Sequence, residues 1–188
     1  GKGQVARAIA SFQKAVELQP DAVDARSNLG IALAGNGQVD RAIVEFQKAL
    51  EFQPENPDTH ASLGNALSLK GQAGEAISHY RQALKARPED AVILNNLGNV
   101  LLAKGQVDEA ISLYEQALKA RPEDAMMHNN LGNVLLAKGQ GDEAISHYQT
   151  AMKTRPEDAM IHKSLGNVLQ QIGRVDEAIA HFRKALEI

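Results

Sequence analysis

The sequence contains no cysteine and no tryptophan, and only 4% of its residues are aromatic. Without cysteine the chain can form neither disulfides nor thiolate metal ligands, which agrees with a reducing compartment, and we expect a cytoplasmic location. So few aromatic side chains leave little surface on which nucleic-acid bases could stack. An excess of basic residues is lacking too, because the formal net charge is −3. We therefore expect no nucleic-acid partner.

Long apolar runs are also lacking, although 44% of the residues are hydrophobic. No uninterrupted stretch is long enough to cross a bilayer, and the first residues show no signal-peptide pattern. We therefore expect no insertion into a membrane. The chain begins at Gly1 rather than at methionine, so it can be a piece of a longer protein that carries a targeting segment elsewhere.

Patterns that support catalysis or cofactor binding are missing as well. No serine has a histidine and an acid at motif spacing, and there is no glycine-rich phosphate loop. The six histidines form three pairs with a separation of 19 residues: His60 with His79, His128 with His147, and His162 with His181. Each pair falls on two different predicted helices without a further ligand, so we interpret these histidines as packing or surface residues. We expect no metal, no cofactor and no enzymatic activity.

An internal repeat organises the chain. The stretch NNLGNVLLAKGQ occurs at Asn95–Gln106 and again, 34 residues later, at Asn129–Gln140. The same period relates five prolines and five Leu-Gly pairs, and a fixed period is the signature of a repeat architecture. We predict one array that covers residues 1–188. It comprises a half repeat, with a second helix alone, in residues 1–22, and five repeats in residues 23–56, 57–90, 91–124, 125–158 and 159–188, the last truncated at its end.

Each repeat is predicted to contain two amphipathic helices. In residues 91–124, apolar residues recur at helical spacing until Gly105, and a second apolar stripe follows between Asp108 and Pro122. We predict that Gly105 ends the first helix and that Asp108 is the N-cap of the second. About three residues separate the two helices, which must therefore run antiparallel. Glycine and alanine allow a close crossing with an aromatic side chain wedged against them, and each hairpin must stack on its neighbours to bury a sufficient core.

The order Leu-Gly, Ala, aromatic, Ala and Pro at these spacings resembles the tetratricopeptide repeat. The resemblance covers essentially the whole chain. It implies an all-α fold with eleven helices, arranged as antiparallel hairpins in a right-handed α-α superhelix. The tryptophan that the family has three residues before each Leu is replaced by Arg26, His60, Leu94, His128 or His162. The tyrosine expected three residues after each Gly is always leucine, and this version resembles the arrays of O-linked N-acetylglucosamine transferases and related bacterial proteins.

The resemblance also implies a binding site, because first helices of such arrays line a concave groove where asparagines bind peptide backbone. Asparagine is a poor helix former, and its carboxamide offers both a donor and an acceptor. The groove candidates are Asn28, Asn65, Asn95, Asn96, Asn99, Asn129, Asn130, Asn133, Lys163 and Asn167, with the apolar Val92, Leu102, Met126, Leu136 and Met160. In the alternative interpretation, the asparagines hydrogen-bond between adjacent repeats, and both interpretations could hold together.

The character of the groove is expected to change along the chain, from mildly acidic at Asp24 and Asp58 to partly apolar in the second half. Lys163 and Asn167 match the first pair of the carboxylate clamp with which some tetratricopeptide domains hold chaperone tails. No other repeat has a lysine at the matching position. We therefore do not expect chaperone-tail binding.

The function that we expect is a non-catalytic scaffold that binds a protein or an extended peptide. Two alternatives remain: the array is the substrate-docking arm of a larger enzyme, such as a glycosyltransferase, or it is a self-assembly module. We also expect weak end-to-end self-association. The reason is that the last predicted helix has apolar residues at Ile179, Phe182 and Leu186, and the apolar Ile188 follows it.

Overall fold

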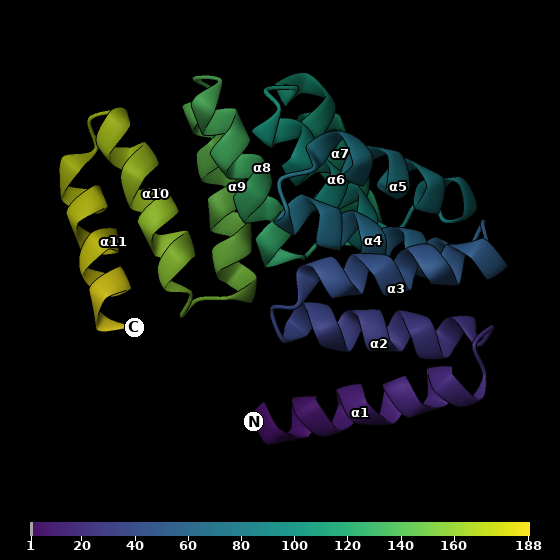
Figure 1. The fold of residues 1–188 in the computed structure, drawn as a ribbon. Helices are drawn as coiled ribbons and strands as arrows, with labels where there is room; N and C mark the ends of the chain where they lie inside the picture. Colours follow the sequence, from purple (N-terminus) through teal and green to yellow (C-terminus); the bar gives the residue numbers. More distant parts are fainter. Residues whose placement is uncertain (1) are drawn as a thin grey trace. The chain divides into compact units, whose positions relative to one another are not determined.

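The computed structural model describes residues 2–188, which form eleven α-helices and no strand (Figure 1). In chain order these are α1 (Lys2–Leu18), α2 (Val23–Gly35), α3 (Val39–Phe52), α4 (Pro57–Leu69), α5 (Ala73–Ala86), α6 (Ala91–Ala103), α7 (Val107–Ala120), α8 (Ala125–Ala137), α9 (Gly141–Thr154), α10 (Ala159–Gln171) and α11 (Val175–Glu187). The predicted fold class, all-α with successive helix hairpins, is confirmed.

The contacts divide the chain into two compact units, Gly1–Lys104 and Gly105–Ile188. The first unit contains α1 to α6 and the second contains α7 to α11. Within each unit every helix packs against the next one in the chain, as Figure 1 shows for α1, α2 and α3. First helices of successive repeats also touch, which brings α4 against both α2 and α6, and α8 against α10. In each unit the first helices therefore form a continuous layer.

Glycine reverses the chain between the two helices of each repeat. Gly105 follows the end of α6 with a φ of 77°, and the equivalent glycines of the other repeats have φ between 74° and 82°. Side chains with a Cβ rarely adopt this left-handed conformation, so glycine is suited to ending a helix here. The prediction that Gly105 ends the first helix is confirmed.

Aspartate side chains cap three of the first helices. Asp124 Oδ1 accepts hydrogen bonds from the backbone N–H groups of Met126 and Met127 at 3.0 and 3.1 Å. Asp90 and Asp158 make the same pair of bonds at the starts of α6 and α10. These bonds satisfy two of the backbone donors that a helix leaves unpaired at its N-terminus.

The predicted cap of the second helix is wrong. Helix α7 already begins at Val107, its N-cap is Gln106, and no side chain caps it. After the left-handed turn at Gly105 the backbone resumes helical conformation within two residues, so Asp108 lies inside the first turn. There its carboxylate accepts from Lys138 Nζ at 2.7 Å, which ties α7 to the end of α8, while its charge still suits the helix dipole.

A glycine on the first helix faces an aromatic ring on the second. A Cβ added to Gly64 would lie 2.8 Å from Tyr80 Cε1, and one added to Gly132 would lie 2.7 Å from Tyr148 Cε1. Both tyrosines are almost completely buried. The predicted wedge of an aromatic side chain against small residues is therefore confirmed in these two hairpins, where it sets the close crossing of the helices.

Candidate functional site

The candidate site is the exposed side of the first helices. In the first unit it consists of residues on α2, α4 and α6, which we call the first-unit surface. In the second unit it consists of residues on α8 and α10, which we call the second-unit surface. The asparagines predicted to bind a peptide all lie on these five helices.

Two hollows open on the first-unit surface. One, of about 350 Å³, lies between α2 and α4 and is lined by Asp24, Ser27, Asn28, Ile31, Asn56, Asp58, Thr59 and Ser62. The other, of about 290 Å³, is lined by Asn65, Ser68, Leu69, Tyr80, Asn96 and Asn99. Their linings are rich in hydroxyl and carboxamide groups, which can both donate and accept hydrogen bonds.

The acidity predicted for this surface is only partly present. Both carboxylate oxygens of Asp58 accept from the guanidinium of Arg87, at 2.6 and 2.7 Å. Such a bidentate pair offsets the negative charge of Asp58. Asp24, which lines the same hollow and is exposed, retains the acidic character expected there.

Asn65 belongs to a hydrogen-bond network that joins two repeats. Its Oδ1 accepts from the hydroxyl of Tyr80 at 2.7 Å and from Nδ2 of Asn96 at 3.0 Å. Burial raises the pKa of Tyr80 to about 12, so this hydroxyl keeps its proton and donates at neutral pH. Asn96 is on α6 and Asn65 on α4, so this pair matches the alternative interpretation of bonds between adjacent repeats.

The second unit repeats part of this arrangement. The hydroxyl of Tyr148 donates to Asn133 Oδ1 at 2.7 Å, and burial raises the pKa of Tyr148 to about 12. Asn133 and Asn167 are exposed, whereas Asn130 is half-buried. Lys163 is exposed one helical turn before Asn167 on α10. These four residues lie on first helices, and their role in peptide binding stays a prediction.

Two of the predicted asparagines are buried rather than open. The relative exposure is 5% for Asn95 and 4% for Asn129, so in this structure neither side chain is open to a peptide. Asn129 Nδ2 contacts Met160 Sδ at 3.9 Å, which shows that its side chain points from α8 towards the neighbouring α10. Residues adjacent in sequence differ by about 100° around a helix, so Asn130 reaches a more open position than Asn129.

Large apolar side chains are exposed on the first helices that carry the asparagines. The second residue of each of the last three first helices is Val92, Met126 or Met160, with relative exposures of 43%, 54% and 65%. Leu102 and Leu136 are half-buried. The apolar spots that we predicted for the second half of the chain are therefore accessible, most of all the two methionines.

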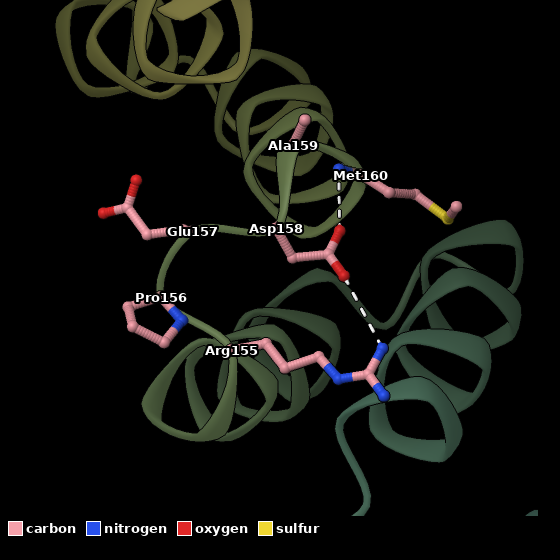
Figure 2. A pocket seen from close by; sticks show the side chains of 6 residues that line it. All are labelled: Arg155, Pro156, Glu157, Asp158, Ala159 and Met160. Carbon is pink, nitrogen blue, oxygen red and sulfur yellow. Dashed lines mark hydrogen bonds and ion pairs between the residues drawn. The ribbon is translucent and has the colours of Figure 1, made fainter. Parts of the chain in front are cut away.

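A hollow that the sequence did not indicate lies where α9 meets α10 (Figure 2). It measures about 630 Å³ and is lined by residues 155–160, the segment RPEDAM. Asp158 accepts from the backbone of Met160 at 2.9 Å and lies 3.8 Å from Arg155 Nη1. Figure 2 shows Arg155 and Met160 directed to one side of the turn and Glu157 to the other. Asp158 is occupied by its role as the N-cap of α10.

A comparison with protein families identifies the repeat. The family model described as Tetratricopeptide repeat matches residues 1–57, 61–125, 95–151 and 129–188. The chain belongs to the tetratricopeptide repeat (TPR) family. Proteins of this family act as scaffolds for interactions between proteins, and this chain has the fold of such a scaffold.

Solved structures of TPR proteins resemble the chain over most of its length. MamA is 26% identical, with 85% of this chain and 93% of MamA covered and a TM-score of 0.77. YrrB, described as a TPR protein with an unusual peptide-binding site, is 24% identical, with 94% and 91% covered and a TM-score of 0.74. A thermophilic TPR protein from Thermus thermophilus is 25% identical, with 88% and 91% covered and a TM-score of 0.71. Among curated proteins, none matches this TPR chain significantly.

Two further observations concern ligands and membranes. Within residues 2–188, no three side chains of the metal-binding types histidine, cysteine, aspartate and glutamate gather closely enough to hold an ion. None of the helices in the described part of the chain combines the length and the apolar character needed to span a bilayer.

Proposed function

We propose that this TPR chain is a non-catalytic scaffold that binds an extended peptide, or an extended segment of a partner protein, along its first helices. The observation that carries the proposal is that large apolar side chains and carboxamides are exposed on the same first helices, α6, α8 and α10. Met126 and Met160 are more than half exposed, although burial of such side chains would be favourable. A flexible thioether side chain adapts to partners of different shape.

The carboxamides supply the polar part of such a site. Asn99, Asn133 and Asn167 are exposed at equivalent positions of three repeats. A carboxamide can donate to a peptide C=O and accept from a peptide N–H, so a series of them suits an extended backbone. YrrB, which is described as having a peptide-binding site, supports the proposal by its similar fold.

The test uses a peptide identified by pull-down and mass spectrometry and then synthesised. In the double variant Asn96→Ala with Asn130→Ala, we expect binding of that peptide to weaken by about 1–3 kcal/mol, because hydrogen bonds in the complex are lost. Isothermal titration calorimetry measures the affinity. Gln149→Ala is the matched control, since it removes an exposed carboxamide from α9, a second helix.

The structural role of Asn96 requires a stability measurement on the same variants. Asn96 bonds to Asn65, so the double variant is also expected to lose about 0.5–1.5 kcal/mol of stability. An unchanged affinity together with a large fall in melting temperature would contradict the binding role and favour bonds between repeats. If the Gln149 variant binds as weakly as the double variant, the first-helix surfaces are not the site.

The alternative of a docking arm of a larger enzyme makes a different prediction from the scaffold. A docking arm predicts that the captured peptides are substrates modified by a catalytic domain joined to this array, whereas a scaffold binds them without modification.

The expected cytoplasmic location stays a prediction, which imaging of the full-length protein in its own cell would test.

A further inference from the structure

All six histidines of the chain take part in three hydrogen-bonded pairs. Each pair joins the first and the second helix of one repeat, with Nδ1 of one ring facing Nδ1 of the other. These distances are 2.9 Å for His60 and His79, 2.8 Å for His128 and His147, and 3.0 Å for His162 and His181. Since the chain has no cysteine, the pairs contain all of its side chains whose ordinary pKa lies between 5 and 8.

The surroundings of each pair determine which nitrogen carries the proton. His60 Nε2 lies 2.8 Å from the carbonyl oxygen of Pro54, which can only accept, so Nε2 donates. A neutral imidazole has one N–H, so His60 Nδ1 must accept and His79 Nδ1 must donate. His128 with Pro122 and His162 with Pro156 repeat this arrangement at 2.8 and 3.0 Å.

This arrangement limits each pair to one additional proton. A proton added to Nε2 of His79 leaves the Nδ1–H of that ring in place, and the hydrogen bond survives. A proton added to His60 must go to Nδ1, and the bond then survives only if His79 moves its own proton to Nε2 and accepts with Nδ1. With either ring charged, a second added proton would set two N–H groups against each other. The pair titrates as one coupled group: the folded hairpin accepts one proton before the bond breaks, whereas the two separate imidazoles of the unfolded chain accept two.

The surroundings of each pair also disfavour the binding of the first additional proton. Burial, and next the neighbouring His60, lower the pKa of His79, while Glu75 acts in the opposite direction. Burial, and next His128, lower the pKa of His147, while Glu115 and Glu143 raise it. Burial, and next His162, lower the pKa of His181, while Glu177 raises it. Glu115 lies on α7, and the other three glutamates lie on the same helix as the histidine that they affect.

We propose that the three histidine pairs act as an acid-sensitive device that loosens the hairpins α4/α5, α8/α9 and α10/α11 as the pH falls below about 6.5. Unfolded histidines bind protons in this range while the folded pairs resist. The stability that the pairs contribute is therefore complete above a pH of about 6.5 and is lost as the pH falls through the lowered pKa of the folded state. The second unit has two of the three pairs, so it responds most. This inference does not depend on the partner that the array binds.

The chain contains its own comparison. In the hairpin α2/α3 the equivalent positions hold Arg26 and Glu45, with Nη1 and Oε2 3.0 Å apart, and Arg26 Nε donates to Pro20 O at 2.6 Å. This pair makes the same two contacts as the histidines, but with a guanidinium and a carboxylate, side-chain types whose ordinary pKa values lie outside the range from 5 to 8. The repeat of residues 91–124 has Leu94 and Leu113 at these positions, which carry no charge. The repeat thus tolerates three chemistries at one place in the hairpin, of which one is sensitive to acid.

Hydrogen–deuterium exchange of the unaltered protein tests the device helix by helix. Exchange is compared at about pH 7.5 and about pH 5.5, after correction for the intrinsic rates. For each proton that the opened hairpin binds and the folded pair excludes, the equilibrium constant for opening rises by up to about tenfold per unit fall in pH. We expect protection of α8 to α11 to fall by that order in acid while α2 and α3 stay unchanged. Equal changes in all hairpins, or no change in α8 to α11, would overturn the proposal.

Variants separate the pairs from other acid effects. His162→Leu with His181→Leu copies the leucine pair of the repeat at Ala91, and His162→Arg with His181→Glu copies the pair Arg26 and Glu45. In both variants α10 and α11 should lose their acid response while α8 and α9 retain it. An unaltered response in α10 and α11 would contradict the inference, and agreement between two such different replacements would rule out a simple packing effect.

The tautomers themselves can be observed without any substitution. Imidazole ¹⁵N shifts should show the proton on Nε2 of His60, His128 and His162 and on Nδ1 of His79, His147 and His181 at about pH 7.5. A histidine that only fills space would show mixed tautomers and an ordinary titration near its usual pKa of about 6.5. That result would overturn the proposal even if the chain is less stable in acid.

Discussion

A glycine and an aromatic ring determine how closely the two helices of a repeat can approach. Gly64 on α4 leaves room for Tyr80 on α5, and the hydroxyl of that ring extends to Asn65. The same tyrosine therefore connects the packing of the hairpin with the polar network of the first-unit surface. A single methyl group at residue 64 would disturb both, because the buried ring has little space into which it can move.

Gly64→Ala should lower the free energy of unfolding by about 1–3 kcal/mol, the usual cost of overpacking a core. Gly74→Ala is the matched control, because Gly74 lies within α5 and an added Cβ would meet nothing within 4 Å. There the better helix propensity of alanine should raise the stability by about 0.5–1 kcal/mol. Urea denaturation measures both, and equal effects in the two variants would contradict the wedge.

The start of a first helix is decided by a few atoms, and one of the five helices lacks its side-chain cap. Helices α4, α6, α8 and α10 begin after Asn56, Asp90, Asp124 and Asp158, each of which accepts backbone hydrogen bonds. Helix α2 begins after Ala22, which has no side-chain group that can accept. The backbone of Ala22, with φ −70° and ψ 92°, nevertheless resembles that of Asp90, with φ −69° and ψ 103°.

Ala22→Asp should therefore stabilise the first unit by about 1 kcal/mol, since a suitable backbone is already present and only the acceptor is missing. Asp124→Ala should cost a similar amount in the second unit, whereas Glu123→Ala, which removes the neighbouring carboxylate, should change little. Thermal unfolding followed by circular dichroism tests the three variants. A loss of stability in Ala22→Asp would show that α2 does not accept a cap there.

At the scale of the whole chain, the apolar residues of the last helix remain accessible. Leu186 has a relative exposure of 88%, and Ile179 and Ile188 are also exposed. Exposed apolar side chains close together favour association with another surface. A contact between this helix and a different surface of a second molecule need not close, so it can extend beyond a dimer.

We expect weak self-association that grows with protein concentration in sedimentation velocity experiments. Leu186→Glu should abolish it by placing a charge in the contact. Leu69→Glu is the control, because Leu69 is similarly exposed but lies on α4, a different helix from the last one. A chain that sediments as a monomer at every concentration, with or without Leu186→Glu, would refute self-assembly at this end.

Most of the fold could be predicted, but the candidate site only in part. Asn99 and Asn133 are exposed, while Asn95 and Asn129 are buried. All four are asparagines on first helices, and the repeat places each of them on a helix without showing what covers it. Asn129 contacts Met160, 31 residues further along the chain. A local pattern does not contain that contact.

The 34-residue period, the helices and their glycine turns follow from the sequence by itself. These features depend on backbone conformation and on hydrogen bonds between residues a few positions apart. Only the tertiary structure decided that histidines 19 residues apart meet nitrogen to nitrogen and that Asp108 pairs with Lys138 rather than capping a helix. Such contacts depend on how two helices cross, and the crossing results from packing glycine against an aromatic ring in three dimensions.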